Sequence, residues 1–427
     1  MRILSLFDGM ACGMLAFQSA GIKVDRYVAF EIDKYAVQTS SHNFSLIEHR
    51  GDVFQADFTE FRGFDFLIGG SPCTYWSIAQ KNNRETEASG MGWELFSQYV
   101  RALHEAQPMY FIYENNKSMS NAIRESITET FGFEPICINS ALVSAQNRQR
   151  LYWVGKRNPD GTYSRVMVEQ PKDRGILLRD VLYGMTDREK ARCVLSSIGR
   201  TTTREYFKKD QGTMAFEPVR IPEYGASEKS RCLTASYSYK GSGEGSLASE
   251  AFPDNPNKQV RDYVAEPINI DGIYDLKSKE TYIQYDLSGK NHNSQDQRAY
   301  YTHSKHGTLN ASSTQSKTGV IEPVNVLYAI PVEFDGDIPT KAVSCADGKT
   351  YSVYLIKNGH ITIKEKQYPI KLADGYYIIR KLTVSECKRL QTVPDWYEFP
   401  VSDSQAYKML GNGWTVEVIA HLIIATQ

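Results

Sequence analysis

The sequence predicts an α/β fold in which a doubly wound sheet is interrupted by a large, mostly β domain. Three observations predict it. Apolar strand-like runs alternate with helical patterns over the first 155 residues, the composition changes after about Arg157, and helical periodicity returns after about Tyr377. Strands that alternate with helices form parallel sheets, which bind ligands at the carboxyl ends of their strands.

Each element of the first region has its own signal. Continuous apolar runs predict buried strands, and apolar residues three or four positions apart predict helices. The expected strands are RILSLF, VDRYVAFEI, FDFLIGG, MYFIYE and LYWVGK. The expected helices are GMLAFQSAG, KYAVQTSSHNF, SNAIRESITETFG and WELFSQYVRALHEAQP, the last of which Pro108 stops.

The middle of the chain is rich in Ser, Thr, Tyr, Gly and Asn, and its short runs TYSVYLI and HITIKEK favour β structure. A weak repeat, EPVRI at Glu217, EPINI at Glu266 and EPVNV at Glu322, indicates related β units, with chance similarity as the alternative.

The end of the chain, RKLTVSECKRLQTVPDWY and SQAYKMLGNGWTVEVIAHLIIAT, is helical in pattern. We expect the last helix to dock on the first region, so that the middle segment is an insertion. The predicted domains are therefore residues 1–157 plus 378–427, and residues 158–377.

Composition limits the functional classes. The chain has 427 residues, 41% of them hydrophobic, which is enough for a substantial core. Its 49 Lys and Arg nearly balance its 50 Asp and Glu, so any basic surface for nucleic acid must be local. No run of 18 apolar residues and no signal peptide occur, which favours an intracellular protein without a membrane span. The seven scattered cysteines lack CxxC pairing and zinc spacing, which favours reduced thiols and no metal.

The first loop, FDGMACG, follows a strand and opens a helix. Gly9 and Gly13 permit close approach of a ligand to the backbone, although a tight structural turn is the alternative. Glu31, at the end of the second strand, is suited to accept hydrogen bonds from ribose hydroxyls. Asp52, after the next strand, is placed to contact an adenine amino group. In this order, the three features favour an adenosine-bearing ligand.

Cys73 follows Gly69, Gly70 and Pro72 on the loop that leaves a buried strand. A buried, inert thiol is the common fate of a single cysteine. Here the stiffened loop directs the sulfur toward the ligand crevice, and a thiolate held there is a nucleophile.

Glu114 ends the strand MYFIYE and emerges on the same rim as Cys73. A helix cap or an ion pair would also explain this carboxylate. Beside a thiol, it can donate to a ring nitrogen of a heteroaromatic substrate while the thiol attacks a neighbouring carbon. In QNRQRLYW, Arg148 and Arg150 face one side of a strand together and supply positive charge for an oxygen or a phosphate, with solvation as the alternative.

These motifs, taken in order, resemble those of the DNA (cytosine-5) methyltransferases. FDGMACG resembles the family's first motif, GGSPC its nucleophile loop, YEN its ENV triad and QNRQRLYWVG its QxRxR segment. RKLTVSECKRLQTVPDWY and SQAYKMLGNGW resemble the two closing motifs. The resemblance covers residues 1–157 and 378–427, about half of the chain, and the SPC form is similar to that of animal de novo methyltransferases.

The resemblance implies a Rossmann-like, class I S-adenosylmethionine-dependent methyltransferase fold with an inserted target-recognition domain. It implies that Cys73 adds to C6 of a flipped cytosine, that Glu114 acts at N3, and that Arg150 holds the O2 side. Arg148 then supports the cleft or a phosphate, and Pro72 shapes the catalytic loop. The implied cofactor is S-adenosyl-L-methionine, with S-adenosyl-L-homocysteine as product. The implied cofactor residues are Phe7, Asp8, Gly9, Gly13, Glu31, Ile32, Asp52, Val53, Pro72, Leu95, Asn412 and Trp414.

The implied partner is double-stranded DNA. We expect DNA contacts from Ser77, Arg148, Lys229, Arg231, Lys240 and Lys305, each with a solvated surface as its alternative. We further expect a cytoplasmic, bacterial or phage-encoded monomer without a metal, for which a restriction endonuclease partner is possible.

Three residues depart from the family pattern: Thr74 follows Cys73 in place of glutamine, Asn116 replaces the valine of ENV, and GNGW with Trp414 replaces GNS. These departures concern the shapes of the base and cofactor pockets. Two alternatives to a DNA methyltransferase remain. A tRNA cytosine methyltransferase would keep this site, whereas a catalytically silent DNA-binding homologue would be expected to lose Cys73 or Glu114.

Overall fold

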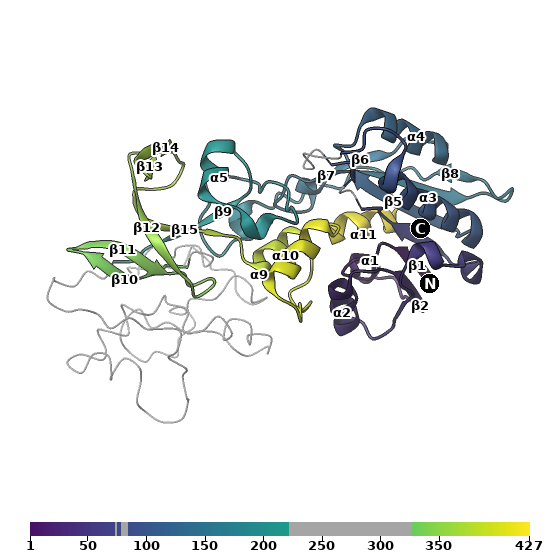
Figure 1. Ribbon diagram of the computed structural model, residues 1–427, viewed down its shortest axis with the longest axis horizontal. Coiled ribbons are helices and arrows are strands. Elements are labelled where there is room, and N and C mark those ends of the chain that lie inside the picture. The colour runs from purple at the N-terminus through teal and green to yellow at the C-terminus, as the bar shows by residue number, and fades with distance from the viewer. Residues whose placement is uncertain (73–74, 78–83, 222–326) are drawn as a thin grey trace, which may run out of the picture. The chain divides into compact units, whose positions relative to one another are not determined.

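The computed structural model describes residues 1–72, 75–77, 84–221 and 327–427, which form two compact units (Figure 1). The first unit contains Met1–Val181, Arg188–Thr213 and Val384–Gln427, and the second contains Leu182–Asp187 and Met214–Thr383. The first unit therefore includes both ends of the sequence. The assignment of residues 158–377 to target recognition stays a prediction.

The first unit is built on an eight-stranded sheet of order β3-β2-β1-β4-β5-β7-β6, with β8 paired to β7. Its strands are β1 (Arg2–Leu6), β2 (Arg26–Phe30), β3 (Ile47–His49), β4 (Phe66–Gly69), β5 (Tyr110–Asn116), β6 (Ile136–Asn139), β7 (Gln149–Arg157) and β8 (Tyr163–Arg165). The first five are parallel, and β7 lies antiparallel between β5 and β6. The strand order reverses between β1 and β4, and sheets with such a reversal bind ligands beside the carboxyl ends of the strands there.

The helices of the first unit begin and end where the sequence provides signals. They are α1 (Cys12–Ser19), α2 (Lys34–Asn43), α3 (Gly90–Ala106), α4 (Asn121–Phe131), α5 (Thr203–Lys209), α9 (Val384–Leu390), α10 (Asp403–Asn412) and α11 (Val416–Ile424). The side chains of Asp33 and Ser120 cap the N-termini of α2 and α4, because each accepts a hydrogen bond from a backbone amide of the first turn. Gln107 ends α3 in the left-handed conformation directly before Pro108, as predicted.

The core of this unit lies on both faces of the sheet. Every residue of β4 is buried, as are four of the five residues of β1, which is the pattern of parallel strands covered by helices on both sides. Helix α11 packs against α1, and Ser19 of α1 donates to Glu417 of α11 (Figure 1). The prediction that the last helix docks on the first region is confirmed.

The second unit contains an antiparallel sheet of order β10-β11-β12-β13-β14, in which β15 pairs with both β12 and β9. Its strands are β9 (Met214–Pro218), β10 (Ile330–Asp335), β11 (Ile338–Val343), β12 (Thr350–Lys357), β13 (His360–Ile363), β14 (Lys366–Pro369) and β15 (Gly375–Lys381). The mostly β character predicted for the middle segment is confirmed for its described part. In this part HITIKEK forms a hairpin, with Lys364 and Glu365 turning at positive φ.

A fully buried ion pair joins two strands of this sheet. The guanidinium of Arg380 on β15 donates to the carboxylate of Glu217 on β9, and neither side chain is exposed. Ser344 Oγ and the amide of Cys345 also donate to Glu217, at 2.8 and 3.0 Å. Both oxygens of the Glu217 carboxylate therefore accept hydrogen bonds, which offsets the cost of burying its charge.

Glu217 lies in the first copy of the weak repeat. The copies at Glu266 and Glu322 lie outside the described residues, so the repeat stays a prediction. Within the described ranges, no helix has both the length and the apolar character needed to cross a membrane.

Candidate active site

The loop after β1 is held against the end of β2. Phe7, Gly9 and Ala11 all have φ between 56° and 60°, which folds the loop tightly. The amide of Gly9 donates to Glu31 Oε2 at 2.8 Å, and the amides of Ile32 and Asp33 donate to Oε1 at 2.8 and 2.7 Å. Three backbone amides therefore fix the Glu31 carboxylate at the carboxyl edge of the sheet.

The surroundings of Glu31 fit a nucleoside. Ile32, the next residue, has 77% of its surface exposed and can offer an apolar face to a ligand ring. Asp52 follows β3, and its carboxylate caps a short 3₁₀ turn that begins at the buried Val53. Phe7 and Leu95 pack partly buried against the same apolar cluster as Val53. Phe7, Glu31 and Asp52 thus follow β1, β2 and β3, while Leu95 lies on α3.

Asp8 and Gly13 support this loop from below. Asp8 Oδ1 accepts hydrogen bonds from Ser5 and Tyr27 at 2.6 Å, while its buried Oδ2 has no partner among the described residues. Burial raises the pKa of the Asp8 carboxyl to about 6. A Cβ on Gly13 would lie 2.3 Å from Ile68 and 2.6 Å from the Tyr27 hydroxyl, so this glycine permits close packing of α1 on the sheet.

The loop after β4 is anchored where it leaves the strand. Gly69 pairs with Tyr113, so the loop begins beside Glu114 of the neighbouring strand. Ser71 Oγ lies 2.6 Å from the Tyr113 hydroxyl, and the Asn115 amide donates to the Ser71 carbonyl at 3.2 Å. Pro72 is exposed. Cys73 lies outside the described residues, directly after this anchored segment.

The other end of the loop is anchored as well. Trp76 is fully buried and donates through Nε1 to Glu85 at 3.1 Å, and Arg84 donates to the Trp76 carbonyl at the same distance. Ser77 is half-buried next to this tryptophan. The chain on both sides of the predicted nucleophile is thus held by hydrogen bonds from the first unit.

Glu114 lies at the centre of a cluster of donors. Its Oε1 forms an ion pair with Nε of Arg150 at 3.0 Å, and its Oε2 accepts the indole N–H of Trp414 at 3.0 Å. The Glu114 and Arg150 side chains retain only 11% and 14% of their exposure. A Cβ on Gly70 would lie 2.9 Å from Glu114 Oε2, so the loop glycine allows the carboxylate to reach this position.

Arg148 is a buried scaffold for the segment that carries Trp414. Its guanidinium donates to the carbonyls of Val194, Gly411 and Gly413, at 2.9, 3.2 and 2.7 Å. These bonds hold the backbone on both sides of Asn412, and the role of Arg148 in the cleft stays a prediction. This geometry does not bring Arg148 to a surface where a phosphate would meet it, and a contact with DNA stays only a prediction.

A second cysteine belongs to this cluster. Cys193 Sγ lies 3.3 Å from Arg148 Nη1 and 3.9 Å from Arg150 Nη2. Burial opposes ionisation of the thiol, but the two guanidinium groups outweigh it and hold the pKa of Cys193 below its ordinary value. By contrast, burial raises the pKa of the Cys12 thiol to about 12. Cys193 thus lies beside two guanidinium groups that favour its ionised form.

The remaining predicted residues are placed as follows. Asn412 is exposed at the end of α10. Lys229, Arg231, Lys240 and Lys305 lie outside the described residues, so their DNA contacts stay predictions. In the described ranges, no group of three His, Cys, Asp or Glu side chains is arranged to hold a metal ion.

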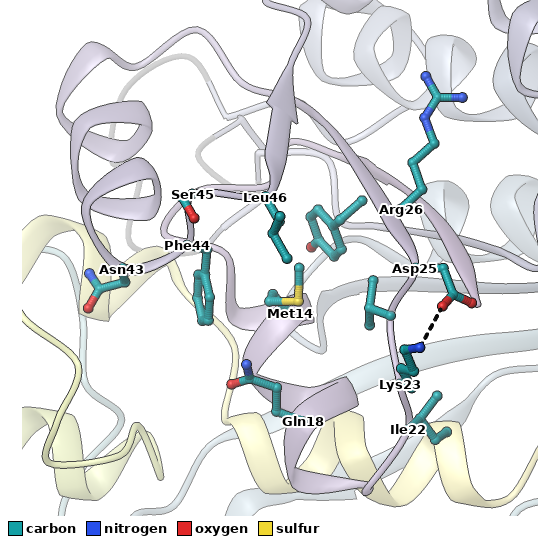
Figure 2. A pocket seen from close by; sticks show the side chains of 12 residues that line it. Met14, Gln18, Ile22, Lys23, Asp25, Arg26, Asn43, Phe44, Ser45 and Leu46 are labelled. Carbon is teal, nitrogen blue, oxygen red and sulfur yellow. Dashed lines mark ion pairs between the residues drawn. The ribbon is translucent and has the colours of Figure 1, made fainter.

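A hollow of about 370 Å³ lies elsewhere on the first unit, lined by Met14, Gln18 and Phe44 among others (Figure 2). Lys23 and Asp25, which form an ion pair 3.7 Å long at its rim, precede β2, whereas Glu31 follows it. The hollow is therefore at the opposite end of β2 from the candidate site.

Sequence reasoning missed several residues that position the site. Tyr113, Asn115 and Ser71 form one hydrogen-bonded group, and Trp76 with Glu85 forms another. The alternation of side chains along β5 places Tyr113 and Asn115 on the face opposite Glu114, which is a signal the sequence contains. Cys193 follows no motif, so only the fold reveals it.

A family profile described as "C-5 cytosine-specific DNA methylase" matches residues 1–427. The chain is 25% identical to the orphan methyltransferase M.SPRI of Bacillus phage SPR, over 98% of this chain and 95% of that protein. It is 32% identical to the type II methyltransferase M.FnuDI of Fusobacterium nucleatum, over 37% of this chain and 47% of that one.

Among solved structures, a DNMT2 mutant from Spodoptera frugiperda has 14% identity and a TM-score of 0.50, with 100% of this chain and 99% of that chain covered; this likeness shows the fold alone. The resemblance read from the motifs is confirmed by the family match over the whole chain. The chain belongs to the C-5 cytosine-specific DNA methylase family and is a DNA (cytosine-5) methyltransferase.

Proposed function

We propose that this methyltransferase modifies cytosine within a defined sequence of duplex DNA, with Cys73 as nucleophile and Glu114 as the group that acts at N3. The observation that carries the proposal is the ion pair between Glu114 and Arg150, both largely buried at the end of β5 and the start of β7. Because β4 and β5 are neighbours, the loop that contains Cys73 begins beside this carboxylate.

The residues act on the base in a defined order. The Cys73 thiolate forms a bond to C6, while Glu114 shares a proton with N3, so that the displaced π electrons make C5 nucleophilic. S-adenosylmethionine, when bound, supplies the electrophilic methyl group that C5 takes. Water takes the C5 proton, the sulfur of Cys73 leaves C6 as a thiolate, and the proton at N3 returns to Glu114, which restores the aromatic ring. Arg150 holds the O2 side of the base.

The described residues fit S-adenosylmethionine as cofactor. Glu31 presents the acceptor site that three backbone amides leave open on its carboxylate for a ribose hydroxyl, and Asp52 presents a carboxylate for the adenine amino group. The exposed Ile32 and the apolar residues around Val53 suit the two faces of the adenine ring. Phe7, Leu95 and Asn412 complete the proposed pocket.

A stacked cytosine cannot reach this buried site, so the target base must leave the duplex, at a cost of a few kcal/mol. Ser77 is proposed to hold a flanking phosphate, and the second unit to read the sequence. The similarity to phage and bacterial methyltransferases supports a cytoplasmic, bacterial or phage-encoded protein, which acts alone or beside a restriction endonuclease.

The test is to identify the product. Bisulfite sequencing of DNA from cells that express the protein reports both 5-methylcytosine and its sequence context. With that target in hand, Cys73→Ala is expected to abolish methyl transfer and to leave the Kd of S-adenosylhomocysteine unchanged. Cys137→Ala is the matched control, because this partly exposed cysteine lies on β6.

Two outcomes would overturn the proposal. Unchanged turnover in Cys73→Ala would refute the nucleophile, as would the failure of 5-fluorocytosine in the target to trap the protein covalently. Methyl transfer to tRNA and not to duplex DNA would refute the substrate.

A further inference from the structure

We propose that Trp414 is a positioning residue for Glu114, a role that rests on the proposed function and differs from contact with the cofactor. The indole Nε1–H donates to Glu114 Oε2 at 3.0 Å, while Arg150 holds Oε1 at the same distance. Each oxygen of the carboxylate therefore has one fixed donor, and the two donors come from different segments of the chain, α10–α11 and β7.

The backbone around Trp414 is fixed by side chains of the first unit. The carbonyl of Gly413 accepts from Arg148 at 2.7 Å and from Gln391 at 3.3 Å. On the other side, Thr415 donates to Gln391 Oε1 at 2.9 Å, and its hydroxyl lies 2.8 Å from that of Ser140. Since both neighbouring residues are anchored, the indole leaves the backbone from a fixed point.

The loop glycine before the nucleophile completes the arrangement. A Cβ on Gly70 would lie 2.9 Å from Glu114 Oε2 and 3.5 Å from Trp414 Nε1. A side chain at this position would therefore meet both the carboxylate and the indole, so the β4 loop passes close to the pair. This close packing limits the rotation of the carboxyl group about its terminal bond, which is otherwise a soft torsion.

The chemistry requires such a restriction. An ionised carboxylate has about four lone-pair sites, and here one on each oxygen is used by Arg150 and Trp414. The other described residues leave one site on each oxygen, which is what a cytosine edge needs: one oxygen to share a proton with N3, the other to accept the N4 amino group. The indole is a donor only, so it orients the carboxyl group without competing for its proton.

The experiment uses exchange of tritium from C5 of cytosine into water, catalysed by the enzyme without cofactor. Addition of Cys73 to C6 lets C5 take a solvent proton, and loss of tritium followed by release of the sulfur regenerates cytosine. The reaction reports Glu114 without methyl transfer. The substrate is a duplex with [5-³H]cytosine in the sequence found by bisulfite sequencing.

Two variants separate the N–H group from the ring. Trp414 replaced by β-(3-benzothienyl)alanine keeps the shape and loses the donor, and Trp414→Phe loses both donor and bulk. The control is Trp396, which is 44% exposed in the same unit and receives the same replacements. We expect the exchange rate to fall at least tenfold in both Trp414 variants, with the Kd of S-adenosylhomocysteine within twofold of wild type, and no change in the control.

An exchange rate in the benzothienyl variant equal to that of wild type would refute the role of the N–H group. A loss of rate matched by an equal loss in duplex binding, or seen equally in the Trp396 variants, would also overturn the proposal. If wild type neither exchanges tritium nor methylates DNA, the proposed function itself fails, which is a distinguishable result.

Discussion

Arg150 Nε and Glu114 Oε1 lie 3.0 Å apart, in an ion pair that joins β7 to β5 at the carboxyl edge of the sheet. Both side chains are mostly withdrawn from solvent. Their interaction is therefore screened little by salt, and loss of one partner leaves the other as an isolated, partly buried charge.

Arg150→Ala is expected to lower kcat for methyl transfer at least a hundredfold, because Glu114 loses the group that orients it. Arg150→Lys should not restore the rate, since the contact is made by the guanidinium Nε, which lysine lacks. Steady-state kinetics on the identified target test this. Arg165→Ala, on the exposed strand β8, is the control. A lysine variant with wild-type kcat would contradict the oriented ion pair.

Glu31→Ala is expected to weaken binding of S-adenosylhomocysteine at least tenfold, because the carboxylate that three backbone amides hold at the end of β2 is removed. Titration calorimetry measures the change. Glu48→Ala, which breaks the exposed pair with Arg26, should leave the affinity as it is. Equal affinities in the two variants would remove Glu31 from the cofactor site.

Cys193 is expected to react with iodoacetamide at lower pH than an ordinary thiol. Its lowered pKa means that the reactive thiolate persists as pH falls below the usual range near 8.5 and is lost only at more acidic pH. Mass spectrometry of the labelled peptides gives the midpoint. Arg150→Gln should move it upward, because one of two neighbouring positive charges is removed. Cys12 should stay unlabelled in the folded protein, and a midpoint unmoved by Arg150→Gln would exclude the proposed cause.

Glu217→Ala is expected to lower the free energy of unfolding by about 3–5 kcal/mol, because the fully buried guanidinium of Arg380 loses its counterion. Urea titration followed by fluorescence measures this. Glu333→Ala breaks the exposed pair with Lys341 and should cost less than about 1 kcal/mol. Similar costs for the two variants would show that the buried pair does not stabilise the second unit.

The sheet of the first unit was predictable because its strands are long apolar runs separated by clear helices. The strands β3, β6 and β8 were missed, since each has only three or four residues and none forms a distinct apolar run. Periodicity needs several residues to show, so short strands are fixed by their neighbours in the sheet and not by their own sequence.

The candidate site was predictable where a chemically reactive or polar residue stands at the end of a predicted strand. Glu31 and Glu114 end strands, and polar residues at strand ends point to ligands. The contact between Glu114 and Trp414 was not predictable, because 300 residues separate the partners in sequence. The contacts of Arg148 with backbone carbonyls were not predictable either. The sequence motif is the same whether its arginine contacts a ligand or buried carbonyl groups.

In the second unit, β9 and β15 are hydrogen-bonded neighbours, from Tyr377 beside Pro218 to Lys381 beside Met214, although more than 150 residues of chain connect them. The two ends of the connecting chain therefore lie side by side in the sheet. Part of this chain, β12, is itself hydrogen-bonded to β15, whereas the entropy of closing a loop grows only slowly with its length. Residues can therefore be added to or removed from the loops of this connection at little entropic cost, as long as β9, β12 and β15 keep their pairing.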